Sequence, residues 1–236
     1  GRPKIKLART YEEAVAIYNK YPNNMLGIVT DVSFKRAGEK DKKAGLKFCS
    51  YIREKDEFLP IIIESSEVEN QKDAMFLNAC FLDKNSKKLP VDLRKTILRN
   101  FGFGDFEFIN PHTGEVIATV RNLKDLQNTI MSIPDESLYY HGSRNHISRW
   151  LYSRAMFPIA ELLRQKQFTD ISESQEMRQL IFDAIVQYRK MKNRGVVAIF
   201  QRERFDKYSN FARIGQGSLG GKGRGLAFID SMIKRH

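Results

Sequence analysis

The sequence has few cysteines and no long apolar run. Only two of its 236 residues are cysteine, Cys49 and Cys80, and both lie in apolar contexts. Two such cysteines give neither a metal-binding spacing nor a disulfide framework, which favours a reducing compartment. No apolar run approaches the roughly 18 residues of a membrane-spanning helix, and no signal-peptide pattern is present. We therefore expect a cytoplasmic protein with no membrane segment.

An acidic excess is also absent. The chain carries 40 basic and 28 acidic side chains, a formal net charge of +12. A basic balance of this size invites a nucleic-acid interpretation. The positive charge is, however, spread evenly between residues 1–100 and the remainder, with no basic tail or arm. Dispersed charge is typical of a solvated surface, so nucleic acid is not the partner that we expect.

The first hundred residues alternate apolar runs with helix-like segments. The runs at 25–30 and 58–63 are continuously apolar, as parallel strands buried on both faces are. This repeated alternation of a strand and a helix predicts an α/β fold with a doubly wound parallel sheet. The predicted strands are 5–8, 25–30, 58–63 and 80–82. One predicted helix begins at Thr10, and the others cover 44–53, 67–77 and 89–100. A loop is predicted at 33–43.

Polar residues follow three of these predicted strands. Asp31 ends the second, Ser65 and Ser66 the third, and Lys84 the fourth. Ligand groups gather at the carboxyl ends of parallel strands, so these four residues are the candidate site. A plainer alternative stays open, in which Asp31 caps the following loop and Lys84 is a surface lysine.

The order of these residues resembles the receiver domain of response regulators. The resemblance implies that Asp31 accepts phosphate and binds Mg²⁺, that Ser65 or Ser66 reads the phosphoryl group, and that Lys84 pairs with it. Two features depart from the family. The first strand and helix, with the acidic pair that holds Mg²⁺, have no counterpart, and Asn85 replaces a proline. The expected fold over 1–100 is therefore an incomplete receiver-like sheet, with Mg²⁺ binding weak or absent.

Residues 101–210 are expected to form a mixed hairpin and helical connector. Alternating aromatics at 101–108 and the run at 115–120 predict a β-hairpin with a bulge near Gly104. Helices are expected at 123–133, from His146 through a kink at Pro158 to Leu163, and at 173–190, followed by a strand at 196–200.

Two histidines of this region, His141 and His146, are five residues apart. A metal site, or a phosphohistidine or acid–base site, is one interpretation, although no third ligand is evident. The favoured interpretation is a histidine-containing turn that leads into an amphipathic helix. Arg144, Arg149 and Arg154 follow a five-residue spacing that spreads them around this helix, which argues against a shared phosphate site.

The last segment, 211–236, is rich in glycine around Lys222. Such a loop lets backbone amides approach an anion, and lysine adds a charge suited to phosphate. The P-loop pattern fails because Gly223 replaces the Ser/Thr that binds magnesium. Gly215, Gly217 and Gly220 meet the dinucleotide pattern, without a convincing preceding strand. The plain alternative is a glycine-rich loop that caps a helix.

The run from Gly220 to Ala227 resembles the opening of the nucleotide-binding domain of phosphoenolpyruvate synthases and pyruvate phosphate dikinases. The resemblance implies an ATP-grasp-like domain in which Gly220, Gly221, Lys222 and Gly223 contact ATP phosphates, with ATP and Mg²⁺ as cofactors. Arg224 departs from the small residue usual there. We expect the rest of such a domain, and the catalytic histidine, to lie beyond His236.

These features together favour a regulatory role. The hypothesis is a receiver-like N-terminal region of a phosphoenolpyruvate synthase-like phosphotransferase that acts on pyruvate, with the fragment itself not catalytic. The expected partners are a sensor kinase or other protein, the downstream ATP-grasp domain and, through exposed apolar faces, a second copy of the chain. The alternative is a phosphorylation-independent pseudo-receiver that acts as a scaffold for protein contact.

Overall fold

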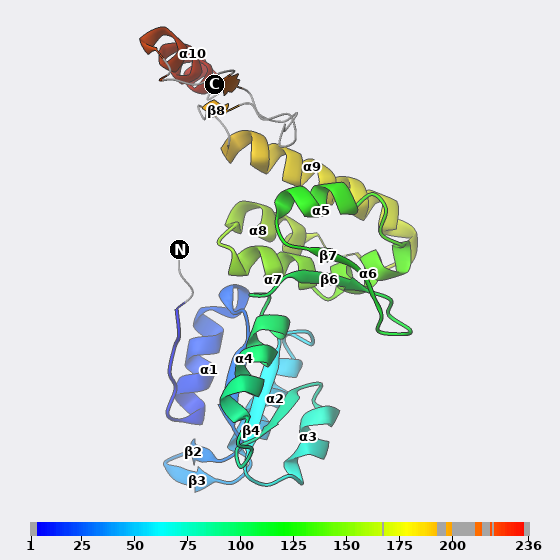
Figure 1. Cartoon of the computed structure of the whole chain (residues 1–236). Coiled ribbons are helices and arrows are strands. Elements are labelled where there is room, and N and C mark those ends of the chain that lie inside the picture. The colour runs from blue at the N-terminus through cyan, green and yellow to red at the C-terminus, as the bar shows by residue number, and fades with distance from the viewer. Residues whose placement is uncertain are drawn as a thin grey trace.

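The chain folds around two separate hydrophobic cores. One belongs to an α/β unit, residues 4–100, and the other to a helical unit, residues 106–192. Figure 1 shows the helical unit stacked on one end of the α/β unit, with helix α10 at the far end of the molecule. The computed structural model describes residues 4–166, 168–192, 197–199, 211–213, 218 and 220–233.

A parallel three-stranded sheet organises the α/β unit. Its strands are β1 (Ile28–Asp31), β4 (Ile61–Ser65) and β5 (Cys80–Asp83), in the order β1-β4-β5. Both neighbours pair with β4 in parallel register. The three isoleucines of β4 are almost fully buried, which explains why its sequence is continuously apolar. The predicted α/β class with a parallel sheet is confirmed at this level.

Helices cover the sheet and close its core. Thr10 caps the first of them, because its Oγ1 accepts a hydrogen bond of 3.2 Å from the Glu13 amide. The helices predicted at 44–53 and 89–100 form with those bounds, whereas the helix predicted at 67–77 is shorter. The helices of this unit are α1 (Tyr11–Lys20), the 3₁₀ turn η1 (Pro22–Asn24), α2 (Ala44–Arg53), α3 (Asn70–Phe76) and α4 (Leu89–Asn100).

The predicted strand at 5–8 is wrong. This segment joins no ladder, and Ile5 and Leu7 are 96% and 77% exposed. The isolated bridge between Thr10 and Lys35 lies two residues after this segment. A short apolar segment forms a strand only when a partner strand and a covering layer are present. Among the described strands, β1 pairs with β4 alone, so segment 5–8 does not pair with β1.

The predicted loop at 33–43 contains a hairpin. Strands β2 (Phe34–Arg36) and β3 (Glu39–Asp41) pair antiparallel. Ala37 and Gly38 between them have φ values of 52° and 84°, the left-handed conformation of a tight hairpin turn. Alanine rarely adopts this conformation, so the turn could not be predicted from the residue types alone.

The helical unit packs six helical segments on a β-hairpin. Phe106 and Phe108 point into its core, so the prediction that these aromatics pack on helices holds for them. The strand irregularity lies between Phe108 and Ile109, not near Gly104. The elements are β6 (Phe106–Ile109), β7 (Val116–Val120), α5 (Leu123–Thr129), α6 (Asp135–Ser143), α7 (His146–Ser153), α8 (Phe157–Gln165), η2 (Ile171–Glu173) and α9 (Ser174–Lys192).

The helix expected to kink at Pro158 is instead two helices. α7 ends at Ser153, and Ala155 has a φ of 57°, which stops the helix. Pro158 then lies in the first turn of α8, where its missing amide hydrogen is not required. The break turns α8 back against α7, and both helices contribute to the core.

The described part of the C-terminal segment contains two short strands and a helix. β8 (Val197–Ile199) and β9 (Phe211–Arg213) pair in parallel, and α10 spans Gly221–Ile233. None of the described helices combines the length and apolarity that crossing a bilayer requires.

Gly45 provides a test of how the α/β unit is assembled. A Cβ added there would lie 2.0 Å from the Asp31 carbonyl oxygen, so Gly45→Ala must push α2 away from β1. We expect a loss of about 3 kcal/mol in the free energy of unfolding, measured by urea denaturation. Gly225→Ala is the control: its added Cβ meets nothing within 4 Å, and alanine favours a helix. Equal stability of Gly45→Ala and the parent chain would contradict this packing.

Candidate functional site

Asp31 and Lys84 meet at the carboxyl end of the sheet. Asp31 ends β1 and Lys84 directly follows β5, on either side of β4. The Lys84 Nζ donates to Asp31 Oδ2 at 2.5 Å, which forms an ion pair across the end of β4. The Lys84 amide also donates to the Ser65 carbonyl at 2.9 Å, so the lysine is fixed to the central strand.

The ion pair is partly exposed and leaves hydrogen-bonding capacity free. The second carboxylate oxygen of Asp31, Oδ1, is 3.4 Å from the Ser33 amide. The Lys84 ammonium carries three hydrogens and uses one on Asp31. The Gly45 amide donates to the Val32 carbonyl, which brings α2 close beneath Asp31. The arrangement presents a carboxylate oxygen and ammonium hydrogens together at an open edge.

The two candidate serines have different environments. Ser65 is only 5% exposed, and its Oγ accepts from the Glu67 amide and from Asn70 Nδ2, each at 3.0 Å. Ser66 is exposed, and its carbonyl accepts from Asn85 Nδ2 at 2.9 Å. Ser65 therefore holds the turn into α3 and retains one hydroxyl hydrogen, whereas Ser66 anchors the loop after Lys84.

Asn70 and Asn85 are residues of this site that sequence reasoning missed. Asn70 is buried and fixes the hydroxyl of Ser65, and Asn85 links the β5 loop to the β4 loop. Asn85 was noted only as a departure from the family proline. No spacing rule marks either side chain, because both act through tertiary hydrogen bonds.

Asp31 is the acid that would offer a carboxylate to Mg²⁺ at this edge of the sheet. Mg²⁺ is usually held by one or two carboxylates, waters and substrate phosphates. Within the described residues, no group of three or more His, Cys, Asp or Glu side chains is arranged to hold a metal ion. The Asp31 carboxylate is paired with an ammonium group instead.

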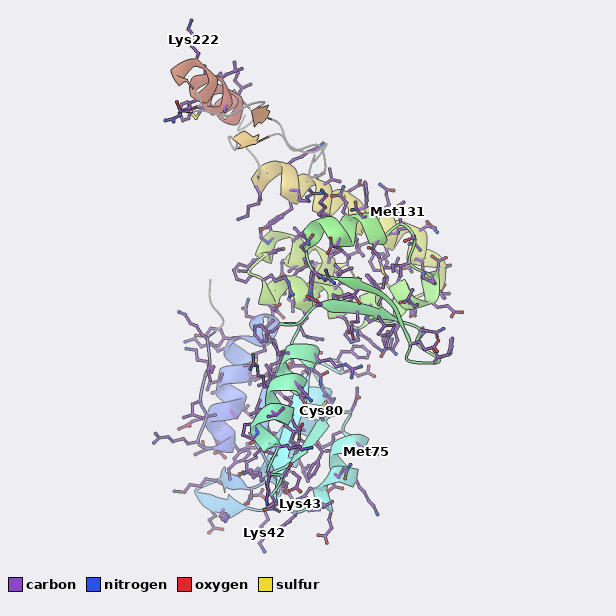
Figure 2. The ribbon with its side chains drawn as sticks, in the orientation of Figure 1. Lys42, Lys43, Met75, Cys80, Met131 and Lys222 are labelled. Atoms are coloured by element: carbon purple, nitrogen blue, oxygen red, sulfur yellow. The ribbon has the colours of Figure 1, made fainter. Side chains whose placement is uncertain are left out.

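The glycine-rich candidate lies far from this site. Gly220 directly precedes α10, and Gly221, Lys222 and Gly223 form the first turn of that helix. Figure 2 shows Lys222 at the far end of the molecule, with its side chain extending away from the ribbon. Gly215 and Gly217 lie outside the described residues.

The two histidines form a buried polar link. His141 Nε2 accepts from the Ile109 amide at 3.1 Å, so its hydrogen must be on Nδ1. That hydrogen points to His146 Nδ1, 3.1 Å away. Burial lowers the pKa of His141 to about 4 and that of His146 to about 3. Both rings are therefore neutral at pH 7, and three of their four nitrogens are engaged in these contacts.

No family model, curated protein or solved structure matches this chain. The resemblances to receiver domains and to phosphoenolpyruvate synthases thus depend on the short residue patterns quoted above. The function has to be inferred from the chemistry of the residues themselves.

The serines allow a matched pair of substitutions. Ser65→Ala removes the acceptor of two hydrogen bonds in a buried turn, and we expect it to lower the free energy of unfolding by about 1–2 kcal/mol. Ser66→Ala removes an exposed hydroxyl and should change it by less than about 0.5 kcal/mol. Chemical denaturation measures both values. The reverse order would show that Ser66, not Ser65, supports the site.

The histidine pair predicts acid sensitivity. Unfolded imidazoles bind protons below about pH 6.5, whereas the folded rings do so only near pH 4 and pH 3. The unfolded state therefore binds more protons as the pH falls from 6.5 to 4, and stability falls with it. The loss should be on the order of 3 kcal/mol for His141 alone, in urea titrations across this range.

Two variants separate this effect from general acid unfolding. His146→Asn removes one titrating ring but keeps an oxygen acceptor, so it should flatten the pH dependence. His112→Asn is the control, because His112 is exposed beside Glu136 and should leave the profile unchanged. A profile that is the same in His146→Asn as in the parent chain would refute the assignment.

Proposed function

We propose that this chain is the regulatory region of an ATP-dependent phosphotransferase similar to phosphoenolpyruvate synthase, with the Asp31–Lys84 pair as its input site. The observation that carries the proposal is the 2.5 Å contact between Lys84 Nζ and Asp31 Oδ2 at the carboxyl end of a parallel sheet. In this proposal residues 4–100 act as a receiver-like domain.

The pair suits a phosphoryl group on chemical grounds. Transfer of a phosphoryl group to the Asp31 carboxylate would replace one negative charge by nearly two and add strong acceptor oxygens. Lys84 would then leave the carboxylate oxygen for the phosphoryl oxygens. In this proposal the remaining hydroxyl hydrogen of Ser65, on the neighbouring strand β4, would donate to the same group. Such an exchange of partners would move the loop that starts at Lys84.

A direct connection leads from this loop to the helical unit. α4 begins five residues after Lys84 and spans 12 residues, about 18 Å. Beyond its end, the Gly102 and Gly104 carbonyls each accept from the guanidinium of Arg154 at 2.7 Å. A displacement at Lys84 would therefore reach the helical unit through a stiff element. The ATP-binding domain implied by the Lys222 resemblance would receive the signal from there.

A second candidate is a phosphorylation-independent scaffold. The ammonium group of Lys84 on the Asp31 carboxylate favours it, because aspartyl phosphorylation needs a metal cation at this carboxylate to screen the charges that approach each other. Met75 and Phe76 at the end of α3 are largely exposed and would serve as contact residues.

Phosphorylation of the whole chain tests the first candidate. The chain is incubated with acetyl phosphate and Mg²⁺, and intact mass is measured. We expect the mass of one added phosphoryl group, lost on Asp31→Asn substitution. In Lys84→Gln the modified form should be less stable, because the counter-charge is missing.

Asp73→Asn is the matched control. Asp73 is a partly exposed acid of α3 that pairs with Lys43, outside the site. It should label as the parent chain does. Labelling that persists in Asp31→Asn would place the acceptor elsewhere and sink the input-site assignment. An unlabelled parent chain would leave the scaffold candidate as the better account.

A further inference from the structure

The outer edge of β1 has no partner strand. Among the described strands, β1 pairs with β4 alone. The Ile28 amide donates to the Pro60 carbonyl at 2.9 Å, so the backbone of Ile28 faces β4. Backbone groups of successive residues in a parallel strand point to opposite sides, so those of Val29 point to the open side. The Val29 amide and carbonyl form no hydrogen bond with a described residue.

One face of β1 is open as well. Ile28 and Thr30 face the core of the α/β unit, whereas Val29 and Asp31 lie on the other face. Val29 is 44% exposed, although its register partner on β4, Ile62, is fully buried. The opposite outer strand differs, because α3 and α4 contact β5 and all four of its residues are half-buried. An apolar edge with free backbone groups is a template for another strand, and β1 provides one.

Segment 4–8 has the sequence pattern of a strand but no partner in its own chain. Basic and apolar side chains alternate along it, and Ile5 and Leu7 are largely exposed. The segment runs beside α1 (Figure 1), and the Lys6 ammonium lies 5.7 Å from the centre of the Tyr21 ring at the end of that helix. The chain therefore exposes both an unpaired strand segment and an unpaired strand edge.

The segment and the edge are complementary in polarity and charge. In a strand added beside β1, Ile5 and Leu7 can lie on the face that the core covers. Lys4 and Lys6 then lie on the open face, which is the face of Asp31. Opposite charges on neighbouring strands stabilise their pairing. The alternation thus matches apolar side chains to the covered face and lysines to an acid.

We infer that β1 is a docking edge for a second copy of this chain, whose segment 4–8 adds to the sheet beside β1. Each copy has one such edge and one such segment, so two copies can exchange segments in a closed two-fold dimer. The exchange removes apolar side chains from water and gives the outward backbone groups of Val29 partners. This inference does not depend on the proposed function of Asp31.

Analytical ultracentrifugation of the full chain over a concentration series tests the dimer. We expect a species of twice the chain mass of 27.4 kDa that grows with concentration. The double variant Ile5→Asp, Leu7→Asp should raise the dissociation constant at least about tenfold, because two carboxylates would enter the covered face. Both side chains are exposed in the single copy, so the variant should fold.

Met131→Asp is the matched control. It replaces an exposed apolar side chain of the helical unit and should dimerise as the parent chain does. A parent chain that is a monomer at every concentration would overturn the inference. So would a dimer that the double variant does not weaken, because the contact would then lie elsewhere.

Mixed cysteine variants test the pairing itself. Lys6→Cys chains are mixed with isotope-labelled Val29→Cys chains and oxidised mildly, and mass spectrometry identifies the linked pair. We expect a disulfide between the two kinds of chain, because neighbouring side chains on one face of a sheet lie about 5 Å apart. Leu7→Cys is the control: its side chain would lie on the opposite face and should link to Val29→Cys far less. Equal yields from the two mixtures would contradict the pairing of segment 4–8 with β1.

Discussion

Burial of β4 is the constraint on which the rest of the structure depends. Ile61, Ile62 and Ile63 are excluded from water on both faces, so β4 must be central and must have helices on either side. Its neighbours run parallel to it, and their carboxyl ends therefore lie at one edge. That geometry alone brings Asp31 and Lys84 together from positions 53 residues apart.

The two ends of this sheet differ in how their charges are satisfied. At the carboxyl end, the Asp31–Lys84 pair is partly exposed and contributes little to stability. At the amino end, half-buried arginines of the helical unit contact the Asn23 side chain, the Phe58 ring and the carbonyls of Gly102 and Gly104. Within the helical unit, the buried guanidinium of Arg178 has hydrogen-bond partners: it donates to the Ile130 and Ile133 carbonyls and to the Asp135 carboxylate.

The sequence predicted the elements whose local signals and burial agree. α2 and α4 have their predicted bounds, whereas β4 begins at Ile61, three residues after the predicted start, and ends at Ser65. The segment 5–8 has a strand-like pattern but no partner strand. The pattern of one segment does not show whether a partner strand is present. The turn at Ala37 and Gly38 depends on a conformation that alanine seldom adopts. Ser65 and Ser66 are equivalent in sequence, and only the contacts of Asn70 and Asn85 separate them.

The weakness of the Asp31–Lys84 pair has a functional consequence. An exposed ion pair is worth at most about 1 kcal/mol, so a ligand or modification needs only a small difference in affinity to open it. The arginine contacts at the other end include several hydrogen bonds, so rearranging them together would cost more than opening this one pair. A signal that enters at Asp31 therefore cannot break those contacts by itself. It can only bias an interface that is already close to balance.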